Sequence, residues 1–385
     1  MSEDLSNKNG SLWDLTRLGQ SVWLDYIRRE ILENGELQRL IDEEAVRGVT
    51  SNPSIFEAAI AKSDDYDDAL EVLAAEGAEA LEAYESLAIA DIQSAADLFR
   101  PIYDATDGRD GFVSLEVSPE LANDTAGSIA EGRRFWQAVD RPNLMIKIPG
   151  SEAGAPAVEA LLTEGINVNI TLLFSIQGYE RVIEAYLKAL ETRVAAGQPV
   201  NRLASVASFF VSRVDSAVDA QLEAKLEAAT SESEKATYRS LLGKAAIANA
   251  KLAYSRFQEV FGGERFAKLK TAGARVQRPL WASTSTKNPD YRDVIYVEDL
   301  IGPDTVNTMP LKTVEAFADH GVARRTVDAD LGGAQAELKA LADAGIDLDK
   351  VTSDLQVEGV EKFVLPFRSL LETLDQKLTE VASRS

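Results

Sequence analysis

The chain has 385 residues, 45% of them hydrophobic, which is enough for one large α/β barrel or two ordinary domains. Its 40 basic and 63 acidic residues give a net charge of −23, which argues against nucleic acid or an anionic membrane as a partner but leaves room for a small anion. The absence of cysteine excludes thiolate metal ligands and a cysteine nucleophile, and the presence of a single histidine, His320, argues against a histidine-rich zinc site and a Ser-His-Asp triad. Any chemistry must therefore use lysine, carboxylates, hydroxyls and amides.

Eight short apolar segments are predicted to be strands, and Ala-, Leu- and Glu-rich segments between them are predicted to be helices. The predicted strands cover residues 21–27, 48–51, 111–117, 143–148, 166–174, 203–210, 278–284 and 305–310. Eight strands that are each followed by a helix favour a (β/α)8 TIM barrel. A doubly wound sheet has fewer strands and usually a glycine-rich loop after the first, which this chain lacks. We predict an α/β fold of the barrel type with additional helices.

The chain is predicted to form a single domain, residues 1–385, because no Pro-, Gly- and Ser-rich linker separates two halves. Two helical regions exceed a minimal barrel: residues 63–102, and residues 213–261, which have the pattern of a helical pair with a break near "ATSESEKA". Closing helices are expected from about residue 333. The start, "MSEDLSNKNG", is polar and acidic, unlike a secretory signal, and no stretch is long and apolar enough to span a bilayer, so we expect a cytoplasmic location.

Polar side chains interrupt the apolar pattern of four predicted strands. Because side chains alternate across a strand, Lys147 in "NLMIKIPG" shares a face with Met145, opposite Ile146 and Ile148. Three other predicted strands also carry polar residues on one face and apolar residues on the other. Their polar residues are Asp25, Glu116, Asn167, Asn169 and Thr171. Taken alone, each of these residues is more often solvated or structural than functional. Polar faces on four strands, all near the carboxyl ends of the strands, favour an active site.

A lysine among apolar neighbours has its charged form disfavoured, so that free amine becomes available to attack a carbonyl. The resulting Schiff base acts as an electron sink for cleaving a carbon–carbon bond, and two carboxylates, Asp25 and Glu116, can perform the accompanying proton transfers. The pattern therefore indicates aldolase-type chemistry that needs no metal and no cofactor.

Several motifs resemble the transaldolases, particularly the longer bacterial form. They are "GVTSNPSIF" (48–56), "LMIKIPG" (144–150), "NVNITLLFS" (167–175), "SVASFFVSRVD" (205–215) and the ending "EGVEKFVLPFRSLLETL". The resemblance runs from about residue 20 to residue 380. It implies a barrel enzyme that moves a dihydroxyacetone unit from sedoheptulose 7-phosphate to glyceraldehyde 3-phosphate, giving erythrose 4-phosphate and fructose 6-phosphate in the pentose phosphate pathway.

The resemblance also implies a role for individual residues. Lys147 is the expected Schiff-base lysine, Asp25 is the expected acid/base of aldol cleavage, and Glu116 and Thr171 are expected to position a catalytic water. Substrate contacts are implied for Asn52, Asn169, Ser208, Arg213, Ser285 and Lys287.

The phosphate-binding residues include one departure from the pattern. Where short bacterial forms carry a second arginine, this chain has Lys287, with Ser285 two residues earlier, and a lysine lacks the bidentate fork of arginine. A solvated loop lysine is an equal alternative for Lys287. For Arg213, an ion pair with Asp215 at the start of a helix is the alternative.

Two other functions remain possible from the sequence. A fructose-6-phosphate aldolase would release free dihydroxyacetone, although the resemblance gives such enzymes a tyrosine in the place of Asp25. A non-enzymatic helical interaction protein is suggested by the acidic helices alone. The expected partners are sugar phosphates, with no nucleic acid or membrane, and the chain is expected to be a monomer or a homodimer.

Overall fold

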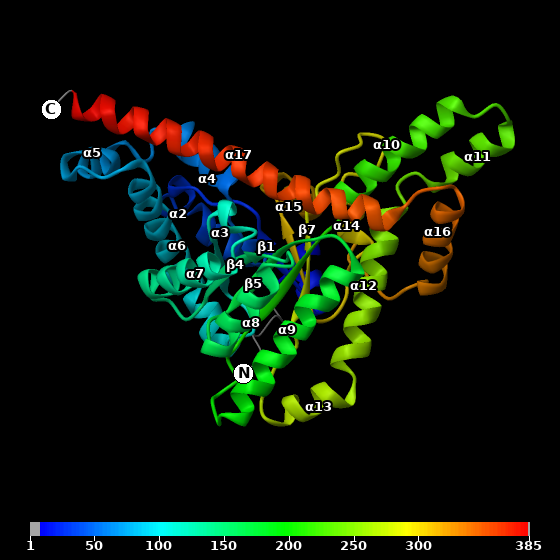
Figure 1. Cartoon of the computed structure of the whole chain (residues 1–385), viewed down its shortest axis with the longest axis horizontal. Helices are drawn as coiled ribbons and strands as arrows, with labels where there is room; N and C mark the ends of the chain where they lie inside the picture. The colour runs from blue at the N-terminus through cyan, green and yellow to red at the C-terminus, as the bar shows by residue number, and fades with distance from the viewer. Residues whose placement is uncertain (1–7, 384–385) are drawn as a thin grey trace.

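A computed structural model describes residues 8–383 and closes eight parallel strands into a barrel, in chain order from β1 to β8 (Figure 1). Most of the polar N-terminal segment, residues 1–7, lies outside the described range. The strands are β1 (Gln20–Leu24), β2 (Val46–Val49), β3 (Phe112–Glu116), β4 (Leu144–Pro149), β5 (Val168–Leu173), β6 (Ser205–Phe210), β7 (Arg278–Ala282) and β8 (Thr305–Met309). Each one overlaps a predicted strand, so the predicted TIM barrel is confirmed.

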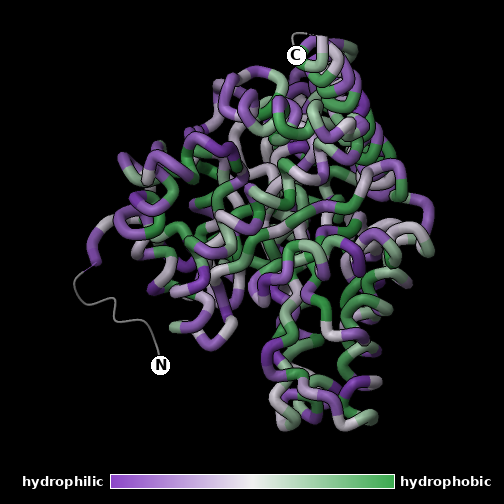
Figure 2. Tube along the Cα trace, turned by 90° about the vertical axis from the view of Figure 1, so that its left-hand side faces the viewer, coloured by the Kyte–Doolittle hydropathy of each residue, from purple (hydrophilic) through white to green (hydrophobic). Residues whose placement is uncertain are grey.

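Helices surround the barrel and extend beyond it. In the first half of the chain they are α1 (Ser11–Arg17), α2 (Arg29–Glu33), α3 (Glu36–Glu43), α4 (Pro53–Ala61), α5 (Asp67–Glu76), α6 (Ala80–Ala105), α7 (Thr125–Val139), α8 (Gly154–Glu164) and α9 (Ile176–Ala195), with a 3₁₀ turn at Pro119–Leu121. The others are α10 (Ser212–Ala228), α11 (Glu232–Leu241), α12 (Ala245–Phe261), α13 (Glu264–Thr271), α14 (Ile295–Glu298), α15 (Leu311–His320), α16 (Leu331–Asp343) and α17 (Leu348–Ala382). Hydrophobic and hydrophilic residues alternate along the outer helices, as expected when one face packs on the barrel (Figure 2).

The region 213–261 differs from the predicted helical pair, because it forms three helices, α10, α11 and α12. The extra helix begins at a capping box within the segment that was expected to be a break. The Ser231 hydroxyl accepts a hydrogen bond from the Glu234 backbone at 3.2 Å, and the Glu234 carboxylate accepts one from the Ser231 backbone at 3.4 Å. These two bonds satisfy backbone donors that would otherwise be exposed at the start of α11.

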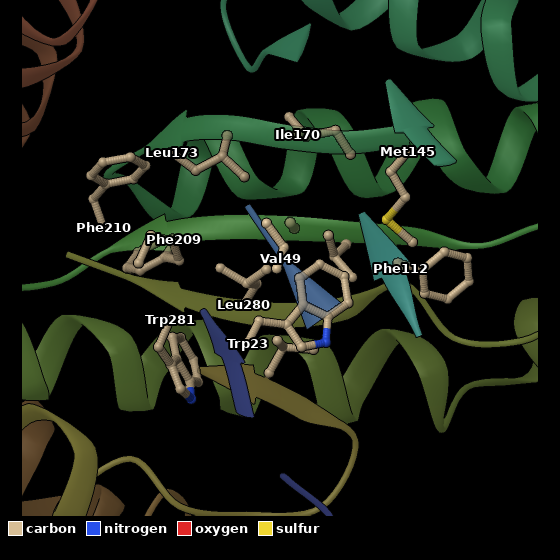
Figure 3. Packing of buried hydrophobic residues seen from close by; sticks show 14 of the residues in the cluster. Trp23, Val49, Phe112, Met145, Ile170, Leu173, Phe209, Phe210, Leu280 and Trp281 are labelled. Carbon is tan, nitrogen blue, oxygen red and sulfur yellow. The ribbon is translucent and has the colours of Figure 1, made fainter. Parts of the chain in front are cut away.

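The buried cluster has an inner and an outer part, separated by the strands (Figure 3). Trp23 of β1 and Phe112 of β3 meet with ring centroids 6.2 Å apart, and the Trp23 indole donates a hydrogen bond to Asp110 at 2.8 Å. On β6, Phe209 packs edge-on against Trp281 of β7 and against Tyr179 of the surrounding helix α9. Apolar packing on both faces of the strands thus fixes the barrel below its polar end.

The long helix α17 crosses the barrel, running along the top of the view in Figure 1. Near its start, Gln356 donates to the backbone carbonyls of Gly150, after β4, and Leu172, in β5, at 3.2 and 3.4 Å. Farther along, Lys377 donates to carbonyls in and after α4. The helix therefore spans from the carboxyl ends of β4 and β5 to α4, which follows β2.

Gly48 in β2 is where the inner packing leaves no room for a side chain. A Cβ atom there would lie 2.7 Å from the Phe112 carbonyl oxygen and 2.7 Å from the Trp23 ring. We expect Gly48→Ala to lower the free energy of unfolding by about 1–3 kcal/mol, the usual cost of overpacking a core. Chemical denaturation followed by circular dichroism measures this change.

The matched control is Gly332→Ala in α16, where a Cβ would meet no atom within 4 Å. Here alanine should leave stability unchanged or raise it by up to about 1 kcal/mol, since it restricts the unfolded chain. Equal effects of the two substitutions would contradict the close packing described at β2.

Candidate active site

The predicted polar residues converge at the carboxyl ends of the strands. In the sheet register, Glu116 of β3 pairs with Lys147 of β4, Lys147 pairs with Asn169 of β5, and Thr171 follows two residues later. A cavity of about 170 Å³ opens at this end. Eight of the ten predicted site residues line it: Asp25, Asn52, Lys147, Thr171, Ser208, Arg213, Ser285 and Lys287. The other two, Glu116 and Asn169, are buried and are not among the lining residues.

Lys147 is almost completely enclosed, with 5% of its surface exposed. Its flanking residues Ile146 and Ile148 are fully buried, as the apolar pattern of the strand predicts. Its amine, however, has two polar neighbours. The Nζ atom lies 3.0 Å from Oε2 of Glu116 and donates a hydrogen bond to the backbone carbonyl of Ser51 at 3.0 Å. The amine is therefore desolvated but held in a defined direction by its neighbours.

Glu116 is a carboxylate with unusual surroundings. Burial raises the pKa of the Glu116 carboxyl above its usual value, and the nearby negative charge of Asp25 adds to this rise, while Lys147 opposes it. Apart from the contact with Lys147, its two oxygens have no hydrogen-bond partner among the described residues, and neither does Oγ1 of Thr171. The site thus contains unsatisfied acceptors beside the amine, which is an arrangement suited to moving protons.

The end of β5 has a local distortion next to Thr171. Leu172 has a positive φ of 60°, and the register between β5 and β6 shifts between Ile170 and Leu173. Such an irregularity at the rim of a barrel changes the direction in which neighbouring side chains point. It is costly for a leucine, so the surrounding contacts must hold it in place.

Asp25 directly follows β1, and its backbone N–H still donates to Met309 of β8 at 2.8 Å. Its Oδ1 accepts a hydrogen bond from the Thr50 hydroxyl at 2.7 Å, and that hydroxyl lies 2.7 Å from the hydroxyl of Thr308. Thr50 and Thr308 also line the cavity. This chain of hydroxyls was not predicted from the sequence, although Thr50 lies within the predicted strand 48–51, two residues before Asn52 in "GVTSNPSIF".

The two asparagines have different positions. Asn52 lines the cavity and caps α4, because its Oδ1 accepts from the Ile55 backbone at 3.0 Å. Asn169 is fully buried, accepts from the Ser208 hydroxyl at 2.7 Å and donates to the Ser114 hydroxyl at 3.0 Å. In this arrangement Asn169 acts on the cavity through Ser208, whose hydroxyl it orients.

Two cations, Arg213 and Lys287, are among the residues that line the cavity. Lys287 donates to the Ser285 hydroxyl at 2.7 Å, and the Arg213 guanidinium lies 5.2 Å from the centre of the Phe210 ring. Burial lowers the pKa of the Lys287 amine, and the positive charge of Arg213 lowers it further. An anion placed between two neighbouring cations would relieve their repulsion, so this corner is suited to a phosphate.

Arg213 does not form the alternative ion pair with Asp215. The Asp215 carboxylate instead accepts hydrogen bonds from the Ala246 backbone at 2.7 Å and from the Tyr296 hydroxyl at 2.8 Å. Within residues 8–383, Nη1 of Arg213 is buried and has no hydrogen-bond partner. The guanidinium is therefore available to a ligand in the cavity.

Phe363 of α17 also lines the cavity, and the sequence analysis did not predict it as a site residue. Its ring centre is 5.6 Å from Lys147 Nζ. The helical pattern predicts a buried phenylalanine at this position but does not show which strand end it covers.

Other surfaces have a different character. A hollow of about 550 Å³ between α2, α5 and α6 is lined by none of the predicted site residues. Two of its four charged residues, Arg29 and Asp91, pair with each other at 2.9 Å. None of the described helices is long and apolar enough to cross a membrane.

The comparison with known proteins agrees with the resemblance seen in the sequence. The family described as Transaldolase/Fructose-6-phosphate aldolase matches residues 22–374. The chain belongs to this family. It is 48% identical to Transaldolase 2 of Nostoc punctiforme, over 95% of this chain and 97% of that protein. It is 48% identical to the transaldolase of Mycolicibacterium smegmatis and 49% identical to that of Thiobacillus denitrificans, over 96% and 93% of this chain and 98% of each relative.

The two cations of this member of the transaldolase/aldolase family are predicted to bind phosphate. We expect Arg213→Gln and Lys287→Gln each to weaken the binding of inorganic phosphate by about tenfold, because each removes a charged donor from a partly desolvated corner. Isothermal titration calorimetry with inorganic phosphate measures the effect on the full chain.

Lys362→Gln is the matched control, because Lys362 is exposed on α17 and pairs with Glu358 at 3.1 Å. Its dissociation constant for phosphate should equal that of the unaltered protein. If the dissociation constant for phosphate is unchanged in Lys287→Gln, Lys287 is a solvated loop lysine and does not bind the phosphate.

Proposed function

We propose that this chain is a transaldolase that moves a dihydroxyacetone unit from sedoheptulose 7-phosphate to glyceraldehyde 3-phosphate, giving erythrose 4-phosphate and fructose 6-phosphate. The family membership and the names of the relatives support this activity. The single observation that carries the mechanism is the buried amine of Lys147, 3.0 Å from Glu116 and in the same cavity as Asp25. The reaction belongs to the non-oxidative pentose phosphate pathway.

The first step joins Lys147 to the donor sugar. The neutral amine attacks the ketone carbon, a carbon–nitrogen bond forms, and the former carbonyl oxygen leaves as water. The raised pKa of Glu116 suits it to take a proton from the amine and return it to the departing hydroxyl. Thr171, whose Oγ1 has no other partner among the described residues, would hold the water of this exchange together with Glu116.

The second step breaks a carbon–carbon bond of the bound sugar. Asp25 takes the proton from the hydroxyl at the fourth carbon, the aldehyde product leaves, and the electron pair is held as an enamine on Lys147. The hydrogen bond from Thr50 at 2.7 Å orients the Asp25 carboxylate for this transfer. The acceptor aldehyde then reacts by the reverse sequence, and hydrolysis frees the new ketose.

The remaining residues of the cavity hold the substrate. Arg213, Lys287 and Ser285 would bind the phosphate, while Asn52 and Ser208 would bind the hydroxyls of the dihydroxyacetone unit. The presence of two cations together with amide and hydroxyl groups among the lining residues supports this division.

We also propose sugar phosphates as the partners of this chain, without nucleic acid or membrane, and a cytoplasmic location, where such charged metabolites are found. A monomer or a homodimer is the proposed assembly, and both are compatible with a site whose residues all belong to one chain.

Reduction of the Schiff base tests the role of Lys147. With fructose 6-phosphate and borohydride, we expect the dihydroxyacetone unit to become fixed on Lys147, as read by mass spectrometry of peptides. Lys147→Ala should give no adduct and lower the transfer rate by at least about 10⁴-fold, because the covalent route is lost. Lys188→Ala, which changes an exposed lysine of α9, is the control and should behave like the unaltered chain. A labelled peptide that lacks residue 147 would overturn the mechanism.

The family description includes aldolases, so the fate of the donor unit needs its own test. With fructose 6-phosphate alone, we expect free dihydroxyacetone to form at least about tenfold more slowly than sedoheptulose 7-phosphate forms once erythrose 4-phosphate is added. Enzymatic assays of both products measure the two rates. Equal rates would identify the chain as a fructose-6-phosphate aldolase.

A further inference from the structure

Phe363 is held above the amine of Lys147 by the course of α17. Gln356, two turns earlier, donates to the carbonyls of Gly150 and Leu172, which belong to the ends of the strands that carry Lys147 and Thr171. These bonds fix the helix over two strand ends at once. Phe363 follows Gln356 by seven residues, and seven residues are close to two full turns, so both side chains point to the same face of the helix.

The helix also approaches the strand ends closely. At Gly359 a Cβ atom would lie 2.9 Å from Cδ2 of Leu172, the residue with positive φ. Only a residue without a side chain lets the helix come this near without displacing the leucine. The position of Phe363 above the cavity is therefore set by direct contact between α17 and β5.

The Phe363 ring faces the reacting amine and excludes solvent from it. The ring centre lies 5.6 Å from Lys147 Nζ, and only 5% of the residue is exposed. Leu365, two residues later, is 67% exposed, so the apolar cover belongs to one face of the helix. The ring offers no hydrogen-bonding atom, in contrast with the polar side chains that make up most of the cavity lining.

We propose that Phe363 is a specificity-determining residue, which favours transfer of the donor unit over its release by keeping bulk water from the adduct on Lys147. This inference rests on the proposed function and deepens it. Nothing in the reaction chemistry itself requires an aromatic ring at this place.

The two fates of the adduct differ in their need for water. In transfer, the enamine carbon forms a bond to the aldehyde carbon of the acceptor, whose oxygen takes up a proton, and water is consumed only afterwards. In release, the enamine carbon takes up a proton, one water adds to the carbon–nitrogen double bond, and dihydroxyacetone leaves as the amine is restored. A closed apolar cover slows the entry of water and protons, so the adduct survives until an acceptor arrives.

The test is the ratio of free dihydroxyacetone to transferred unit, measured with fructose 6-phosphate and a fixed concentration of erythrose 4-phosphate. We expect Phe363→Ala to raise this ratio by about tenfold. Phe363→Leu keeps an apolar side chain of similar bulk and should give a ratio between those of the alanine variant and the unaltered chain. Leu365→Ala, on the exposed face of α17, should leave the ratio unchanged.

This ratio distinguishes shielding from a structural role, because partial unfolding lowers both products equally and leaves their ratio constant. A ratio in Phe363→Ala within about twofold of the unaltered chain, with the adduct still trapped on Lys147, overturns the inference alone. A ratio in Phe363→Leu as high as in Phe363→Ala also overturns it. Absence of any trapped adduct in the unaltered chain would overturn the proposed function itself.

Discussion

The architecture of the site depends on one buried contact, between the amine of Lys147 and the carboxylate of Glu116. Removing two charged groups from water costs several kcal/mol for each group, and their attraction offsets this only when other groups complete the arrangement. Here the Ser51 carbonyl accepts from the amine, while the glutamate oxygens keep unused acceptor capacity. Adjacent parallel strands place the two residues directly opposite each other, so the barrel supplies the rigid support that the contact requires.

The same contact explains how a polar residue can occupy an apolar strand. The flanking isoleucines are fully buried and lie on the other face of β4, where they hold the strand in the barrel wall. The apolar packing of these isoleucines thus offsets the cost of removing the Lys147 amine from water. A group held in this way is ready to exchange a proton with its neighbour without rearranging the surrounding side chains.

Much of this arrangement could be predicted from the sequence, because alternation along a strand is a local property. Alternation with a period of two was enough to predict that Lys147 shares a strand face with Met145 and that Glu116 shares one with Ser114. Once the strand count indicated a barrel, the carboxyl ends of the strands had to meet at one face. The fold and the convergence of the polar residues followed from these two facts.

What the sequence did not show depends on contacts between distant segments or on local backbone geometry. The side chain of Asn169 is held between the hydroxyls of Ser208 and Ser114, and strand alternation does not show these partners. The extra helix α11 begins at a serine that composition alone marked as a break. Phe363 lies beside Lys147 only because α17 crosses the barrel, and a helical period carries no information about that crossing.

The course of α17 has a consequence for the order in which the site is completed. During synthesis a chain emerges from its N-terminal side, so the last barrel strand, which ends at Met309, is made before α17 begins at Leu348. All eight strands and the lysine are then present while the mouth of the barrel is still uncovered. The segments that carry the nucleophile are therefore made before the helix that shields it from water.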